Sequence, residues 1–207
     1  VHEYRNSDGQ LLMSVLRMEM HNKTRDNGKP AKFFMPFRLA SLPEQADDAV
    51  LVNHTTRIGW LIKGVPSGHL RPVYGMERVP QWRAAGGRKI LIVEGEKTAD
   101  AARRLLAASS ERQDWIVFSP LGGGNSALHA DWSDLAGPLS DVTGEIEVLV
   151  WPDADPPTVM RKTGRKIDRQ ETYASDIVNG LGYALHRAGV PLDQVSFARI
   201  SPVDGVA

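Results

Sequence analysis

The sequence has 207 residues, enough for one large domain or two small ones with a substantial core. Its 25 basic and 25 acidic residues cancel, so any nucleic-acid contact must come from a local patch of charge. The absence of cysteine excludes disulfides, thiolate zinc sites and cysteine nucleophiles. No run of about 18 apolar residues and no signal-peptide pattern occurs. These features predict a soluble, cytoplasmic protein without a membrane partner.

Residues 1–86 are predicted to form a small, mainly antiparallel β subdomain. Short runs of strand character alternate with turn signals, of which Asp8-Gly9 and Asn27-Gly28 are the strongest. We expect strands at about residues 11–17, 32–37 and 60–62. A short connection over residues 71–75 then leads to Gly86-Gly87, which marks the predicted boundary.

From residue 87 the pattern changes to alternating strands and helices, which indicates a parallel α/β sheet. In chain order we expect strand 89–94, helix 96–108, strand 115–119, a short helical stretch at 126–136, strand 146–151, helix 171–188 and strand 195–200. Residues 87–207 are therefore predicted to be one domain, a Rossmann-like parallel sheet with flanking helices.

Acidic residues follow two of these predicted strands. Glu94 ends one apolar run, and Asp153 and Asp155 follow another. Because the carboxyl ends of parallel strands meet at one edge of a sheet, we expect the three carboxylates to come together. They would repel one another without a divalent cation, and oxygen ligands of this kind suit Mg²⁺ or Mn²⁺. We therefore predict that Glu94, Asp153 and Asp155 are metal ligands and catalytic residues of phosphoryl transfer.

Each half of this motif also has a purely structural explanation. Glu94 and Glu96 flank Gly95 at the start of a predicted helix, where the helix dipole favours acidic side chains. Asp153-Ala154-Asp155 is compatible with an ordinary turn. The pairing of the two halves at one sheet edge is what favours the functional interpretation.

Glycine and basic residues near the acidic motifs are candidates for phosphate binding. The glycine loop after the second strand either aims backbone N–H groups at a phosphate or makes a tight connection, and both readings stay open. The basic run at 161–169 is also typical of a solvated loop, although it directly follows the acidic pair. The predicted phosphate ligands are Lys97, Gly122, Gly123, Gly124, Arg161, Lys162 and Arg165.

Basic residues of the first part form a second candidate strip. Lys32 and Arg38 lie in it, with Phe33, Phe34 and Phe37 interleaved. These rings either stack on nucleic-acid bases or pack into the core of the β subdomain.

These residues together resemble the Toprim domain of primases from phages, plasmids and other mobile elements. The matching stretches are residues 90–101, the glycine loop near 122–124 and residues 150–155. The first part is similar to the segment that precedes Toprim in such proteins, including Arg71-Pro72-Val73-Tyr74-Gly75. The resemblance covers nearly the whole chain. It implies that Glu94 is an acid/base or metal ligand and that Asp153 and Asp155 bind metal.

The resemblance implies a DNA primase catalytic core that makes short RNA primers on single-stranded DNA from nucleoside triphosphates. The first part would hold the template, with Lys32, Arg38 and Arg71 as nucleic-acid ligands. Thr98 stands where many bacterial primases have an acidic residue, so the number of metal ions stays open. The cysteine-based zinc module and a Walker-loop helicase are absent, and the chain starts at Val1. We therefore expect part of a longer protein, or an enzyme that depends on a replicative helicase.

Two other functions stay open at this point. A Toprim nuclease would use the same metal site to cleave phosphodiesters, and a non-catalytic nucleic-acid-binding module would use the fold as a scaffold. A topoisomerase needs a nucleophilic tyrosine, and the four tyrosines occur in no motif that fits this role. They are Tyr4, Tyr74, Tyr173 and Tyr183.

Overall fold

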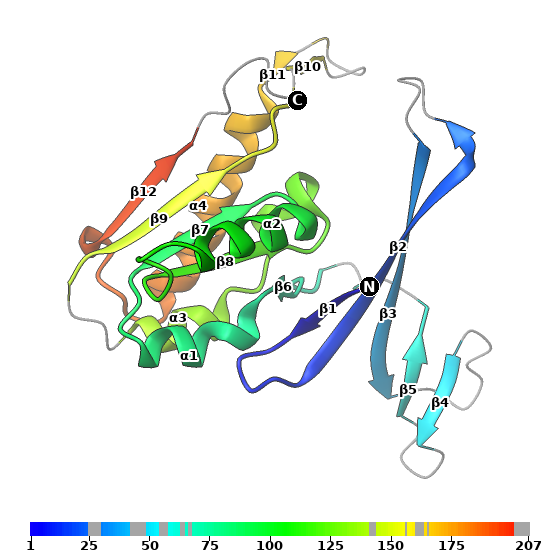
Figure 1. The fold of residues 1–207 in the computed structure, drawn as a ribbon, viewed down its shortest axis with the longest axis horizontal. Helices are drawn as coiled ribbons and strands as arrows, with labels where there is room; N and C mark the ends of the chain where they lie inside the picture. Colours follow the sequence, from blue (N-terminus) through cyan, green and yellow to red (C-terminus); the bar gives the residue numbers. More distant parts are fainter. Residues whose placement is uncertain are drawn as a thin grey trace.

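The computed structural model is a mixed α/β protein with two five-stranded sheets (Figure 1). It describes residues 1–24, 30–41, 49–53, 58–62, 65, 68–140, 144–155, 157–159, 164 and 166–200. Within these residues the chain forms four α-helices and one additional two-stranded sheet. No helix in this part of the chain is both long and apolar enough to cross a membrane.

The first sheet is antiparallel throughout, as predicted, and its strand order is β1-β2-β3-β5-β4. Its strands are β1 (His2–Arg5), β2 (Leu11–Thr24), β3 (Pro30–Ser41), β4 (Ala49–Asn53) and β5 (Ile58–Leu61). The predicted turn at Asp8-Gly9 is confirmed, because Gly9 has a φ of 80° and its N–H donates to the Asn6 carbonyl at 3.0 Å. The turn predicted at Asn27-Gly28 lies outside the described residues.

One face of the β2–β3 ribbon is directed at the second part of the chain. Directly opposed residues of antiparallel strands share a face. On this face the pairs are Met13 with Arg38, Val15 with Pro36, and Arg17 with Phe34. Met13 and Val15 are buried together with Tyr4, against partly buried residues that include Tyr74 and, from the second part, Leu121. The ribbon therefore packs on the second part through its apolar residues and leaves two arginines on the same face.

The second sheet has the order β12-β9-β7-β8-β6, with four parallel strands and β6 antiparallel at one edge. Its strands are β6 (Val73–Tyr74), β7 (Lys89–Val93), β8 (Trp115–Pro120), β9 (Ile146–Trp151) and β12 (Val195–Arg199). The small sheet is β10 (Thr158–Val159) with β11 (Lys166–Ile167). The helices are α1 (Val79–Ala84), α2 (Glu96–Ala107), α3 (Ser133–Leu139) and α4 (Arg169–Arg187).

Helices cover both faces of the second sheet (Figure 1). On β7, Ile90 and Ile92 face the core formed with α1, α3 and α4, whereas Leu91 and Val93 face α2. A parallel strand covered on both sides has no exposed face. This is why the β7 residues from Ile90 to Val93 are all apolar. The strand ends at Val93, so Glu94 follows directly at the carboxyl end of β7.

The predicted connection over residues 71–75 is wrong in part. Val73 and Tyr74 form β6, which pairs with β8, so the sheet is mixed and not wholly parallel. The helix α1 that follows was not predicted, and its Val79 and Trp82 side chains are buried in the main core. The division into domains at residues 86 and 87 stays a prediction, and β6 and α1, which precede it, pack with the second sheet.

The helical stretch predicted at 126–136 is divided in two. A 3₁₀ turn, η3 (Ala127–His129), precedes α3, and Ala130 between them is extended. At this interruption Ala130 forms an isolated parallel β-bridge with Arg71. The last helix begins at Arg169, since the Asp168 side chain accepts the Glu171 N–H at 3.1 Å and caps it.

Candidate active site at the strand ends

The ends of β7 and β9 meet, as the strand-end argument predicts. The Glu94 side chain accepts a hydrogen bond from the Asp153 backbone N–H through Oε2, at 3.1 Å. Its other oxygen, Oε1, accepts the Gly124 N–H, also at 3.1 Å. A single carboxylate thus joins three loops, which follow β7, β8 and β9. We call Glu94, Asp153 and Asp155 the carboxylate site.

The electrostatics of Glu94 reflect this convergence. Burial raises the pKa of Glu94 above its ordinary value, and the two backbone hydrogen bonds from Asp153 and Gly124 lower it. The negative charges of Asp153 and Asp155 raise the same pKa, so both aspartates act on Glu94. The carboxylate is therefore held near two others of the same sign.

The two aspartates differ in their partners. Burial and then the charge of Asp155 raise the pKa of Asp153, whereas the charge of Lys32 on β3 lowers it. Asp155 forms an ion pair with Arg169, with Asp155 Oδ2 and Arg169 Nη1 separated by 3.2 Å. The Gln170 side-chain amide also donates to the Asp155 carbonyl at 3.4 Å. Both contacts come from the first turn of α4.

The three carboxylates of the site are not arranged as a complete metal-binding site. Among the described residues, no group of three or more acidic or histidine side chains is arranged to hold a metal ion. The physical reason is visible at Glu94, because each of its oxygens already accepts a backbone N–H. The donor chemistry nevertheless fits a hard divalent cation, since it consists of carboxylate oxygens that repel one another.

The glycine loop lies directly against Glu94. A Cβ on Gly124 would lie 2.6 Å from Glu94 Oε1, and one on Gly123 would lie 3.0 Å from the Glu94 carbonyl oxygen. Gly122 and Gly123 have φ values of 85° and 59°, in the left-handed region that glycine tolerates. The loop needs glycine for close approach and for backbone conformation. The Gly124 N–H is directed at Glu94, so phosphate binding by this loop stays a prediction.

A pocket of about 560 Å³ opens beside the carboxylate site. The second part contributes Glu94, Gly95, Glu96, Leu121, the three loop glycines and Asp153, and the first part contributes Val15, Arg17, Phe34, Pro36, Val65 and Arg71. Arg17 lies over the Phe34 ring at 5.8 Å and within 3.6 Å of Glu19, and its buried Nε has no hydrogen-bond partner among the described residues. Arg71 donates through Nη1 to Ser126 Oγ. Two guanidinium groups therefore line the pocket that contains Glu94 and Asp153.

Of the other predicted phosphate ligands, only Lys97 is described, and it does not line this pocket. Lys97 is exposed and its Nζ lies 3.7 Å from Glu19 Oε1 on β2. Arg161, Lys162 and Arg165 lie outside the described residues. Arg169, the last member of the same basic run, is described and binds Asp155.

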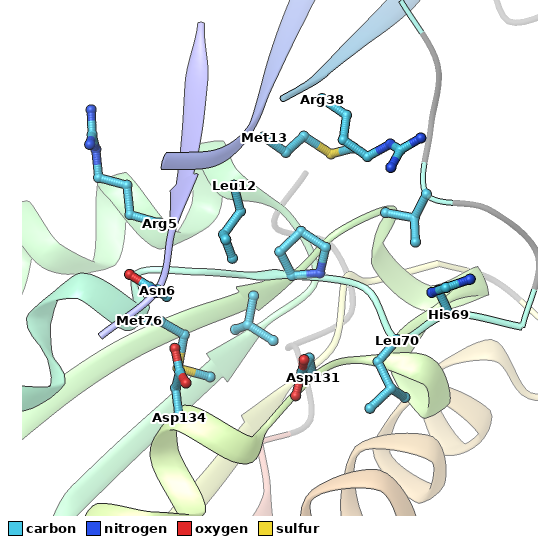
Figure 2. Close-up of a pocket in the computed structure, with 13 residues that line it drawn as sticks. Arg5, Asn6, Leu12, Met13, Arg38, His69, Leu70, Met76, Asp131 and Asp134 are labelled. Atoms are coloured by element: carbon cyan, nitrogen blue, oxygen red, sulfur yellow. The ribbon is translucent and has the colours of Figure 1, made fainter. Parts of the chain in front are cut away.

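Arg38, a predicted nucleic-acid ligand, lines a second pocket of about 440 Å³ (Figure 2). Figure 2 shows Arg38 and Met13 at the top of the view, with Asp131 and Asp134 at the bottom. The Arg38 Nε is buried and has no hydrogen-bond partner among the described residues. This pocket shares Val65 with the pocket at the carboxylate site.

Sequence reasoning did not assign two residues that the structure brings to the site. Arg17 alternates with Met13 and Val15 along β2, a period-2 pattern that places it on the inner face once the strand register is known. Tyr173 is one helical turn after Arg169, and its pKa is raised well above the usual range by burial and then by the charges of Glu94 and Asp153. Neither position can be predicted until the β2–β3 register and the first residue of α4 are known.

Comparisons of the chain with protein-family models, with curated proteins and with solved structures give no match.

Proposed function

We propose that this chain is the catalytic core of a DNA primase, with residues 87–207 as its Toprim domain. Four parallel strands with helices on both faces support this fold assignment. The observation that carries the proposal is the hydrogen bond between Glu94 and the Asp153 N–H, which joins acidic residues 59 positions apart at adjacent strand ends.

The carboxylate site would hold Mg²⁺ or Mn²⁺ through Asp153, Asp155 and Glu94. When bound, the cation lowers the barrier for attack of a 3′-hydroxyl on the α-phosphate and stabilises the departing pyrophosphate. Asp155 is held by Arg169 and Gln170, so α4 fixes its orientation. Glu94, whose pKa is raised, is the candidate to accept the proton of the attacking hydroxyl.

Positive groups around the site suit nucleotide phosphates. Arg17 and Arg71 line the pocket with Glu94 and Asp153, and a guanidinium matches phosphate oxygens in pairs. The buried Nε of Arg17 is an unused donor, which a phosphate oxygen would satisfy. The charge of Lys32 reaches Asp153, so the first sheet contributes to the same electrostatic environment.

The first sheet would hold a template strand through Arg17 and Arg38, which line the pockets on either side of the apolar contact made by Met13 and Val15. Arg17 and Arg38 belong to cross-strand pairs four residues apart, which is about 14 Å at the usual rise per residue. Both have a buried Nε without a partner among the described residues, and their pockets share Val65. This spacing fits phosphates of one strand that passes from the Arg38 pocket of Figure 2 to the carboxylate site.

The test is primer synthesis on single-stranded DNA with labelled ribonucleotides and Mn²⁺. We expect the protein to make short RNA products, and the Asp153→Asn and Asp155→Asn variants to lose about 100-fold or more of this activity. Asp193→Asn is the matched control, because Asp193 is an exposed aspartate in a 3₁₀ turn away from the site. We expect this variant to retain the activity of the parent protein.

Other products would overturn the proposal. Shortened DNA without primers would assign the same carboxylates to a nuclease. Retention of DNA without either product, in the parent protein and the variants alike, would assign a non-catalytic binding function.

A further inference from the structure

A pocket of about 500 Å³ lies between α1, α2 and the first half of β8. This volume is typical of sites that bind small molecules. Three arginines line it together with aromatic, amide and aliphatic side chains, and none of the described lining residues is acidic. We call it the arginine pocket, and its charged and aromatic residues are Arg78, Arg103, Arg112, Trp82 and Trp115.

The arginine pocket is separate from the carboxylate site. It lies where β8 begins, since Trp115 is the first residue of that strand and is level with Lys89, the first residue of β7. Glu94 instead follows the carboxyl end of β7. The two sites therefore lie towards opposite ends of the parallel strands. No residue lines both the arginine pocket and the pocket beside the carboxylate site.

Arg103 holds a fixed positive charge in the wall of the pocket. Its Nη1 donates to Asp100 Oδ1 at 3.1 Å, and its Nη2 donates to the Val117 carbonyl at 2.7 Å. The guanidinium carbon also lies 4.6 Å from the centre of the Tyr74 ring. The side chain is only 13% exposed, and its buried Nε has no hydrogen-bond partner among the described residues. Arginine keeps its charge even when buried, so these contacts fix a cation at this position.

Arg78 and Arg112 add two positive groups that solvent can reach. The Arg78 side chain is 55% exposed, and its Nε lies 3.3 Å from Glu77 Oε1. The exposed Arg112 guanidinium has no ion pair or hydrogen bond with another described residue. Burial and then the charge of Arg78 lower the pKa of Arg103, which means that these two guanidinium groups repel one another. An anion in the pocket would reduce this repulsion.

We propose that the arginine pocket binds a small molecule through a phosphate or polyphosphate group. A guanidinium presents paired N–H donors that match two phosphate oxygens. Arg78 and Arg112 would donate to the phosphate oxygens, and Arg103 would attract them by its fixed charge. A free polyphosphate and the phosphate tail of a nucleotide share this chemistry. The proposal does not rest on the proposed function, because no residue of the carboxylate site takes part in it.

The test is calorimetric titration of the full chain with tripolyphosphate and with ATP. A chelator removes divalent cations, so that a metal at the carboxylate site cannot contribute. We expect the parent protein to bind at least one of the two probes. The Arg78→Gln and Arg112→Gln variants should each bind it about threefold to tenfold more weakly, as for the loss of one charged contact.

Arg104→Gln is the matched control, because Arg104 is an exposed arginine of α2 that does not line the arginine pocket. It should bind both probes as the parent protein does. Urea unfolding midpoints should be the same in all three variants, since each removes an exposed side chain.

The outcomes distinguish the two sources of phosphate. Tighter binding of ATP than of tripolyphosphate would support the proposal with a nucleotide as the ligand, and equal or weaker binding of ATP would support it with a free polyphosphate. A parent protein that binds neither probe at millimolar concentration would overturn the proposal. An equal loss of affinity in Arg104→Gln, or no loss in Arg78→Gln and Arg112→Gln, would also overturn it, because binding would then not depend on the pocket.

Discussion

Glu94 connects three loops through one side chain. Its two oxygens accept N–H groups from Gly124 and Asp153, so the carboxylate acts as a clamp between the loops after β8 and β9. A side chain with both oxygens engaged is oriented before any ligand arrives, which reduces the ordering needed at the moment of binding. A ligand of Glu94 would share these two oxygens with the Gly124 and Asp153 N–H groups.

The close contact with Glu94 makes Gly124 a sensitive position. The Gly124→Ala substitution would place a methyl group 2.6 Å from Glu94 Oε1, and the flexible glutamate side chain would move away. We expect primer synthesis and Mn²⁺ affinity to fall, while the free energy of unfolding changes by no more than about 1 kcal/mol, the value of one hydrogen bond.

The control is Gly182→Ala in α4, where a new Cβ meets no atom within 4 Å. Alanine is favoured over glycine in a helix, so this variant should be about 0.5–1 kcal/mol more stable and fully active. Urea unfolding and the primer assay measure both variants. Full activity of Gly124→Ala would contradict the position assigned to Glu94.

The pH dependence of stability reports on Asp153. Burial and the charge of Asp155 raise its pKa above the ordinary value of 3.8, so the folded protein binds this proton more tightly than the unfolded chain. The free energy of unfolding should therefore fall as the pH rises from about 4 through the raised pKa of Asp153. In Asp153→Asn this contribution is absent and the fall should be smaller.

Urea unfolding of the parent protein and Asp153→Asn between about pH 4 and pH 7 measures this difference. Because the side chain is partly exposed and its charge is screened, we expect less than about 1 kcal/mol at pH 7. If the free energy of unfolding fell more steeply with pH in Asp153→Asn than in the parent protein, the pKa of Asp153 would not be raised in the folded state. That result would contradict the close approach of Asp153 and Asp155.

At the level of elements, strongly periodic segments were predictable and short ones were not. The strands β7, β8 and β9 and the helix α2 follow from apolar runs and helical spacing, which local sequence carries by itself. The short strand β6 gains its identity only from pairing with β8. The helix α1 is six residues long, too short for a clear period, and depends on burial of Val79 and Trp82.

Some residues of the candidate site could likewise be predicted from local sequence, and others could not. Glu94 and Asp153 were predictable because the strand-end rule converts sequence position into spatial position. Arg17 and Tyr173 were not, because their place depends on the β2–β3 register and on the start of α4. Pattern alone cannot place a residue whose neighbours are set by a second element.

At the scale of the whole molecule, the first sheet packs on the second part through the buried side chains of Tyr4, Met13 and Val15. Tyr4 is fully buried between them and its hydroxyl donates to Glu96, in the first turn of α2. The Ser7 N–H donates to Asp134 Oδ2 at 2.9 Å, at the edge of the Arg38 pocket. These contacts fix the first sheet relative to the carboxylate site.

This arrangement predicts that a change in the interface separates template positioning from metal binding. The Tyr4→Phe substitution leaves partly buried Glu96 without its donor, so we expect the free energy of unfolding to fall by about 1–3 kcal/mol. Primer synthesis should fall as well, because the sheet carrying Arg17 and Arg38 is held less firmly. Mn²⁺ affinity should change little, since Glu94, Asp153 and Asp155 all belong to the second part and, among the described residues, the first sheet acts on them only through the charge of Lys32. Urea unfolding, the primer assay and Mn²⁺ titration measure the three effects, with Tyr183→Phe as the exposed control. A parallel loss of Mn²⁺ affinity would mean that the first sheet also shapes the carboxylate site.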